Sequence, residues 1–239
     1  MSAGVKNVHA SVETGRDLDS DNPVRIGVSS MITPVDAVKY YQEIIDYIGE
    51  HTGRPTQMIQ RKTYEEMDLM LEKGEVKIAF ICSASYIINR RSFGVEPLVA
   101  PSVDGKAVYH SYIIAHKDSP IKSFPELKGM IFAFTDPRSN TGTLYPTYLL
   151  KTLKSTPEKY FGKYIYSYSH NKSVELVAKK IADGAAVDSL VYEYMLKSNS
   201  PYTRQTRIIK RSPPYGMPPL VVTKHIHPDM RKRLKETLL

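Results

Sequence analysis

Strand-like and helix-like segments alternate along most of this chain, and that alternation constrains the fold more than any other feature. Short apolar runs end in small polar residues and are followed by apolar residues at helical spacing. This order is typical of α/β layers around a largely parallel sheet, where ligands bind outside the carboxyl ends of the strands. The residues that follow five predicted strands are therefore candidates for a small-anion site: Ser29 and Ser30, Cys82 and Ser83, Thr135, Ser169 and His170, and Asp188.

One of these junctions has the composition of an anion-binding turn. The apolar run 130–134 breaks at Asp136 and Pro137, passes through Ser139, Asn140 and Thr141, and enters a helix pattern. The first turn of a helix has unpaired N–H groups and a partial positive charge, and both favour a bound anion. Ser, Asn and Thr are also the usual capping residues, so an ordinary helix cap stays open as the alternative.

The helix after this turn has a proline near its start. Pro146 lacks an N–H, which costs nothing only within the first turn, so we expect the helix to begin nearer Thr141 or Thr143 than Ser139. The apolar positions of this helix are Leu144, Tyr148, Leu149 and Leu153.

Two helices are predicted before this point. Thr33 and Pro34 begin the first helix, whose apolar face is formed by Val35, Val38, Tyr41, Ile45 and Ile48. Thr63 and Glu66 have the spacing of a capping box and begin the second.

Length and composition are those of a globular protein. The 239 residues suit one large domain or two lobes, and 41% are hydrophobic. No apolar run approaches the ~18 residues that a membrane span needs. Residues 1–22 are expected to form a flexible leader without the apolar centre of a secretion signal, which indicates either a cytoplasmic protein or a signal already removed.

The charge favours anionic partners. Thirty-three Lys and Arg against 25 Asp and Glu give a formal charge of +8. The basic residues are scattered and no nucleic-acid-binding motif is present, so nucleic acid is not expected as a partner. The single cysteine, Cys82, excludes an internal disulfide. His225 and His227 stand two apart but make a weak zinc pair, and we expect no metal or cofactor.

Several segments together resemble a known family, the periplasmic binding proteins for phosphate, phosphite and phosphonates that serve ABC transporters. The resemblance spans about 24–223, and Asp-Pro-x-Ser-x-Thr-Gly at 136–142 is its most diagnostic part. The other segments are 25–29, 74–86 with its Ser85-Tyr86 pair, Ser169-His170, 187–189 and 212–222.

The resemblance implies an α/β fold of two three-layer lobes joined by two crossing strands, with the ligand held between them. The crossings would lie near Ser111 to His116 and Pro213 to Val222. Lobe one would then comprise residues 23–114 plus 213–239, and lobe two residues 115–212.

The resemblance also implies the residues that contact the oxyanion: Ser139, Asn140, Thr141, Tyr64, Tyr86, His170 and Asp188. Tyrosine hydroxyls would donate hydrogen bonds without fixing a counter-charge. His170 would donate from its ring and gain charge as pH falls. Asp188 would favour a ligand that has a P–OH proton.

Three positions depart from the family pattern. Pro218 stands where aminoalkyl-phosphonate binders tend to have an acid, which favours phosphate-like or phosphite-like ligands. Cys82 stands where glycine is usual, so a thiophilic ligand such as arsenite stays open. The chain ends at Leu239, inside what should be a longer helix.

The expected function is therefore that of a monomeric, non-catalytic, extracytoplasmic binding protein for a small phosphorus oxyanion. It would close around the ligand and serve an ABC permease. Two alternatives stay open, namely the sensory domain of a signalling receptor and an enzyme on the same fold.

Overall fold

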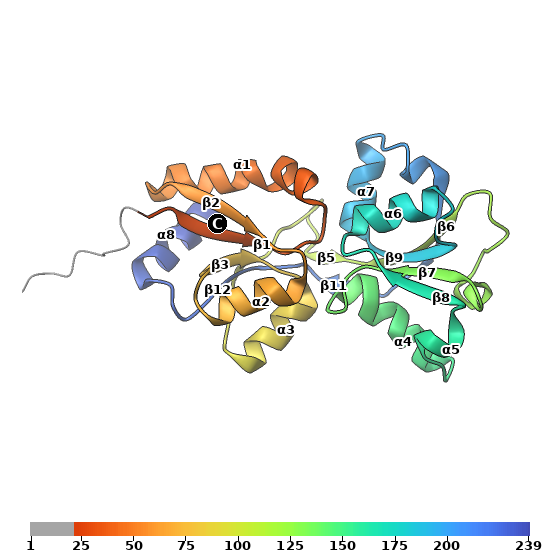
Figure 1. Ribbon diagram of the computed structural model, residues 1–239. Helices are drawn as coiled ribbons and strands as arrows, with labels where there is room; N and C mark the ends of the chain where they lie inside the picture. The colour runs from red at the N-terminus through yellow and green to blue at the C-terminus, as the bar shows by residue number, and fades with distance from the viewer. Residues whose placement is uncertain (1–21) are drawn as a thin grey trace, which may run out of the picture.

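The computed structural model describes residues 22–239, which form two α/β lobes side by side (Figure 1). The predicted leader, residues 1–22, lies outside the described residues except for Asn22. Among the residues that are described, no helix is long and apolar enough to cross a membrane.

Lobe one is built on a five-stranded sheet in the order β2-β1-β3-β12-β4. β1 runs parallel to β2 and β3, and β12 runs antiparallel to β3 and β4. The strand bounds are β1 Val24–Val28, β2 Thr56–Gln60, β3 Ile78–Phe80, β4 Glu96–Val99 and β12 Leu220–Val222.

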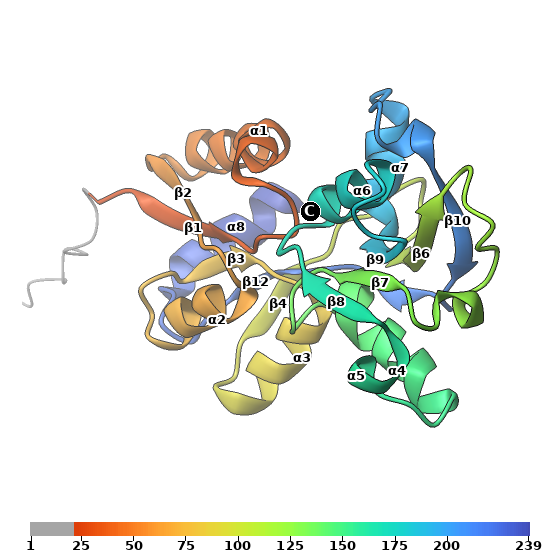
Figure 2. The same ribbon diagram turned by 45° about the vertical axis from the view of Figure 1, so that its right-hand side comes forward.

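Four helices cover the two faces of this sheet (Figures 1 and 2). α1 (Pro34–Thr52) and α8 (Pro228–Leu238) pack on one face, and α2 (Tyr64–Glu72) and α3 (Ser83–Ser92) pack on the other. The predicted capping box of Thr63 and Glu66 is present at the start of α2.

The predicted apolar face of α1 is correct only in its second half. Ile45 and Ile48 are buried in the core of lobe one, whereas Val35 is 83% exposed and Val38 is 49% exposed. The start of α1 lies near lobe two, where the Thr33 N–H donates to Asn171 Oδ1 at 3.1 Å.

Lobe two repeats the same plan with the order β10-β6-β9-β7-β8. β7 is parallel to β8 and β9, and β6 is antiparallel to β9 and β10. The strand bounds are β6 Ser111–His116, β7 Ile131–Phe134, β8 Lys163–Tyr166, β9 Gly184–Asp188 and β10 Thr206–Arg211.

The helices of lobe two also divide between two faces. α4 (Tyr145–Thr152) and α5 (Pro157–Tyr160) pack with an aromatic cluster that includes Phe132 and Phe134. α6 (His170–Ala178) and α7 (Ser189–Lys197) cover the other face. The remaining short elements are η1 (Phe124–Leu127), the π-helical turn η2 (Asn140–Leu144) and η3 (Thr203–Gln205).

The chain passes between the lobes along β5 (Val108–Tyr109) and β11 (Tyr215–Gly216), which pair as an antiparallel ladder (Figure 1). The first crossing was expected near Ser111 to His116, but these residues form β6 inside the second sheet. The crossing therefore lies earlier in the chain, at β5. Residues 111–114, which were predicted to belong to lobe one, are therefore part of lobe two.

Candidate anion site between the lobes

The turn that follows β7 is buried and tightly organised. The Ser139 N–H donates to Asp136 O at 2.9 Å, and Ser139 Oγ accepts the N–H of Gly142 at 3.0 Å. The N–H groups of Thr143 and Leu144 both donate to Ser139 O. The N–H of Thr141 is not among the bonded groups of this turn, although Thr141 is buried and its carbonyl accepts from Ser111 Oγ at 2.6 Å.

The same turn faces lobe one rather than open solvent. The Asn140 N–H donates to Cys82 Sγ at 3.4 Å, and Asn140 Nδ2 donates to the Tyr109 hydroxyl at 3.1 Å. Cys82 directly precedes α3 and Tyr109 belongs to β5, so one residue of lobe two contacts both lobe one and the crossing segment. The expected ordinary cap and the expected interlobe position are therefore both present, because Ser139 caps the turn while Asn140 bridges the lobes.

Several helices begin at this interface. The Tyr64 N–H at the start of α2 donates to Asp136 Oδ2 at 3.0 Å. At the start of α6, the His170 N–H donates to Met31 O of lobe one at 2.9 Å. At the start of α7, the Asp188 N–H donates to His170 Nδ1 at 3.0 Å. Because the amino end of each helix has a partial positive charge, their convergence favours an anion here.

Tyr64 supplies the strongest indication that something else binds at this interface. Its side chain is fully buried, and its hydroxyl faces the Ser139 side chain without a well-aligned hydrogen bond to any of the described residues. Burial raises the pKa of this hydroxyl well above its ordinary value, so it remains a hydrogen-bond donor. A buried polar group without a partner costs about 1–3 kcal/mol, which a ligand oxygen would recover.

His170 does not behave as expected. Its Nδ1 accepts the Asp188 N–H, and burial lowers the pKa of the ring to about 3. The ring is therefore neutral over the physiological range, with its proton on Nε2. The expectation that His170 gains positive charge as pH falls was wrong, because desolvation outweighs any neighbouring charge.

Asp188 is a helix cap and a titratable group at once. Its Oδ1 accepts the Leu190 N–H at 2.7 Å, which caps α7. Burial raises the pKa of this carboxyl from 3.8 to about 7. Its charge also acts on the hydroxyls of Tyr41, Tyr64 and Tyr109, so Asp188 faces the same interface.

Tyr86 is the one expected residue that the structure does not bring to this group. It lies in α3, where it packs on the core of lobe one. Its hydroxyl accepts from Arg90 Nη1 at 2.8 Å near the surface.

Tyr109 occupies the place that sequence reasoning gave to a second tyrosine. It is buried, and its hydroxyl bonds to Asn140. The sequence contains 17 tyrosines, and a two-residue strand leaves no periodic pattern from which to choose this one. Its place immediately before the predicted crossing strand was the only available signal.

The arginine of this turn is engaged elsewhere. Arg138 Nη1 donates to Asp68 at 2.9 Å and Nη2 donates to Glu65 at 2.8 Å, both in α2. The groups identified around residues 139–141 are therefore N–H groups, hydroxyls, a thiol, a neutral imidazole and a carboxyl. Such a set suits an anion of low charge, bound by dipoles rather than by a counter-ion.

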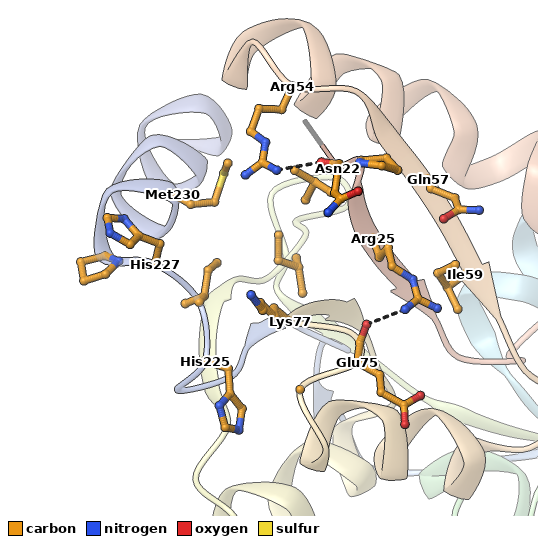
Figure 3. Close-up of a pocket in the computed structure, with 16 residues that line it drawn as sticks. Asn22, Arg25, Arg54, Gln57, Ile59, Glu75, Lys77, His225, His227 and Met230 are labelled. Atoms are coloured by element: carbon orange, nitrogen blue, oxygen red, sulfur yellow. Dashed lines mark hydrogen bonds between the residues drawn. The ribbon is translucent and has the colours of Figure 1, made fainter. Parts of the chain in front are cut away.

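A separate cavity of about 900 Å³ lies in lobe one, away from this interface (Figure 3). Arg25, Lys77, His225 and His227 are among its lining residues, and Arg25 Nη1 donates to Glu75 O at 3.1 Å. It contains none of the residues predicted to bind the oxyanion. We assign the candidate site to the interlobe turn, because helix starts converge there and because buried Tyr64 and Thr143 hydroxyls lack a partner among residues 22–239.

The two-lobed fold, with its polar groups gathered between the lobes, is that of a periplasmic binding protein. A sequence profile described as "ABC transporter, phosphonate, periplasmic substrate-binding protein" matches residues 26–239. The chain belongs to this family of substrate-binding proteins.

Two curated relatives are similar in sequence. The phosphate-import protein PhnD of Mycolicibacterium smegmatis is 25% identical over 206 residues, which cover 82% of this chain and 64% of the relative. The probable ABC transporter phosphite binding protein PhnD1 of Prochlorococcus marinus is 31% identical over 190 residues, which cover 76% of this chain and 57% of the relative. The chain thus spans less than two thirds of the length of either relative.

Solved structures share the fold. A binding protein component of an ABC phosphonate transporter from Pseudomonas aeruginosa matches with a TM-score of 0.81 at 23% identity, covering 90% of this chain and 73% of that one. PhnD1 from Prochlorococcus marinus, in complex with methylphosphonate, matches with a TM-score of 0.79 at 20% identity, covering 91% and 85%.

Proposed function

We propose that this protein captures a small phosphorus oxyanion between its two lobes for uptake by an ABC transporter. The ligand would be phosphate, phosphite or a simple phosphonate. The observation that carries the proposal is the buried Tyr64 hydroxyl, which faces the Ser139–Thr141 turn without a well-aligned hydrogen bond to any described residue. Family membership and the ligands named for the relatives support the same class of compound.

Both lobes supply groups that would contact the ligand. Lobe two supplies the amino end of the turn, including the Thr141 N–H, and lobe one supplies the Tyr64 hydroxyl. Tyr109 reaches the same turn from the crossing segment through Asn140. Because the two halves come from different lobes, we expect the lobes to separate about β5 and β11 for release and to close for capture.

Asp188 would set the protonation state of the ligand. A carboxylate accepts hydrogen bonds only, so in its charged form it would favour a P–OH group. In its neutral form it could donate to a ligand oxygen. Both states are accessible near neutral pH, since its pKa lies at about 7. The site should therefore bind singly charged phosphorus oxyanions better than a permanent dianion such as sulfate.

The proposed place of action is the extracytoplasmic side of a membrane, with an ABC permease as the partner that receives the ligand. This follows from the family rather than from a surface identified in the structure. A signalling partner and the monomeric state both stay predictions.

A thermal-shift panel tests the proposal. Phosphate, phosphite, methylphosphonate, aminoethylphosphonate, sulfate and arsenite would each be added in excess. We expect one or two phosphorus compounds to raise the unfolding midpoint by several degrees, as a ligand at about 100 times its Kd adds about 2.7 kcal/mol. The absence of a shift with every phosphorus compound would overturn the proposal, and turnover of a phosphoester would favour the enzyme alternative.

A further inference from the structure

We propose that Arg138 is a positioning residue that holds the lobes closed by binding α2, rather than a residue that contacts the ligand. The inference rests on the proposed function and adds to it the contact that sets the closed position of the turn.

Arg138 binds the carboxylate of Asp68, which is held in place by residues of lobe one alone. This carboxylate is buried, its Oδ1 accepts from Asn89 Nδ2 at 2.7 Å, and its Oδ2 accepts from Ser85 Oγ at 3.1 Å. Both partners belong to α3, so the carboxylate is fixed without help from lobe two. Neither partner is a cation, however, and a buried carboxylate is stabilised most by a counter-charge.

Arg138 of lobe two supplies that charge across the interface. Its Nη1 donates to Asp68 Oδ2 at 2.9 Å, and its Nη2 donates to Glu65 Oε1 at 2.8 Å. The side chain of Arg138 is 31% exposed, whereas that of Asp68 is 3% exposed. The planar guanidinium thus binds two acidic side chains of α2 at once. Because its N–H groups have fixed directions, this contact fixes the orientation of Arg138 and also neutralises charge.

A second contact ties the same segment to the start of α2. Asp136 Oδ1 accepts the Arg138 N–H at 2.8 Å, and its Oδ2 accepts the Tyr64 N–H of lobe one at 3.0 Å. Ser139 follows directly in the chain. Arg138 and Asp136 therefore fix the position of the turn relative to Tyr64, and separating the lobes would remove the Arg138 cation from Asp68.

The lobes also meet on the other face of the first sheet. There Asn171 Oδ1 accepts the Thr33 N–H at 3.1 Å, and Asn171 Nδ2 donates to Thr33 Oγ1 and to Asp36. In the described part of the chain, none of these residues forms a hydrogen bond with Asp68 or Arg138, so this second contact provides an independent comparison for the first.

The test is a set of four variants titrated with phosphite and with methylphosphonate: Arg138→Gln, Asp68→Asn, the double variant, and Asn171→Ala in the Asp68→Asn background. We expect each single change at Arg138 or Asp68 to weaken both ligands by the same factor, about tenfold or more, so that the ratio of the two affinities is unchanged. The double variant should lose no more than the worse single variant, whereas Asn171→Ala should add its own effect.

Glu65→Gln is the matched control, because Glu65 is exposed and its ion pair with Arg138 is screened by solvent. It should change either affinity by less than about threefold. A change in the affinity ratio in Arg138→Gln would overturn the inference in favour of direct ligand contact. Additive losses in the double variant, or parent-like affinity in Asp68→Asn, would overturn it as well.

Small-angle X-ray scattering separates this inference from the proposed function. Because the Arg138–Asp68 contact needs no ligand, the ligand-free parent should populate the closed state in part. Without ligand, Arg138→Gln and Asp68→Asn should therefore both have a larger average radius of gyration than the parent. This readout applies even if no phosphorus oxyanion binds. Equal radii for the parent and both variants would overturn the role of Arg138, whatever the ligand proves to be.

Discussion

The residues that define the candidate site have buried polar groups, and some of these groups lack a hydrogen bond within the described residues. The Tyr64 hydroxyl and Ser29 Oγ are both buried without a partner in the described part of the chain. Ser29 directly follows β1, and Tyr64 is the first residue of α2. The strand ends suggested Ser29 for this edge of the sheet, and the family resemblance suggested Tyr64. They were not enough to predict which way a tyrosine on a helix points, which is why Tyr86 was expected and Tyr109 was missed.

Removing the Tyr64 hydroxyl tests its role directly. In Tyr64→Phe, the affinity for phosphite should fall about ten- to hundredfold, because one hydrogen bond to a charged oxygen is worth about 1.5–3 kcal/mol. The ligand-free protein should unfold at the same temperature or slightly higher. Calorimetric titration and thermal unfolding measure both effects.

Tyr86→Phe is the control for that change, because its hydroxyl bonds to Arg90 near the surface. Its affinity should equal that of the parent. A loss of affinity in Tyr86→Phe as large as in Tyr64→Phe would show that the wrong tyrosine has been placed in the site.

Asp188 gives the folded state a pH dependence with a defined sign. Its folded pKa of about 7 lies above the ordinary 3.8, so its stabilising contribution is complete below pH 3.8 and is lost as pH rises through 7. The unfolding midpoint of the parent should therefore fall relative to Asp188→Asn between pH 4 and pH 8, by several degrees. Asparagine caps helices as well as aspartate does, so the comparison isolates the charge.

Thermal scans of both proteins across this range provide the measurement. A constant difference between the two midpoints would mean that Asp188 titrates at its ordinary pKa. Burial lowers the pKa of His170 from 6.5 to about 3, so this neutral ring makes the folded state less stable as pH falls below 6.5. Parent and Asp188→Asn share this effect, so it cancels in the difference between their midpoints.

At the scale of the element, the π-helical turn explains the largest error of the sequence pattern. Leu144, Tyr148 and Leu153 were predicted as apolar positions of this helix, but each is more than 40% exposed, whereas Tyr145 and Leu150 are buried. The wider turn at Asn140–Leu144 shifts the phase of the helix that follows it. It also places Pro146 at the start of α4, where a missing N–H costs nothing.

Gly142 is required by the geometry of this turn. A Cβ atom built there would lie 2.4 Å from both Cβ and Oγ1 of Thr135 and 3.0 Å from Ser139 Oγ. Gly142→Ala should therefore destabilise the protein by about 1–3 kcal/mol and weaken phosphite binding, since the turn must move. Chemical denaturation and titration would measure the two losses.

Gly216→Ala offers a control on the crossing segment, because a Cβ there meets no atom within 4 Å. Its stability and affinity should match those of the parent. If Gly142→Ala also matched the parent, the packing of the turn against Thr135 would not be needed for binding.

At the scale of the whole molecule, the alternation of strands and helices predicted the α/β class, and the resemblance supplied the two lobes. The comparisons and the structure confirm both. The position of the crossing could not be read from the sequence, because β5 and β6 are adjacent in the chain and β6 is as apolar as a lobe-one strand. The contact of Arg138 with Asp68 joins residues 70 positions apart, so no local pattern could have revealed it.

The most direct measurement is a crystal structure of the protein with phosphite or methylphosphonate. The account predicts the oxyanion between the lobes, with oxygens about 2.5–3.2 Å from the Tyr64 hydroxyl and from the Thr141 N–H. An oxyanion bound instead in the cavity lined by Arg25 and Lys77, with no ligand atom near Tyr64, would contradict it.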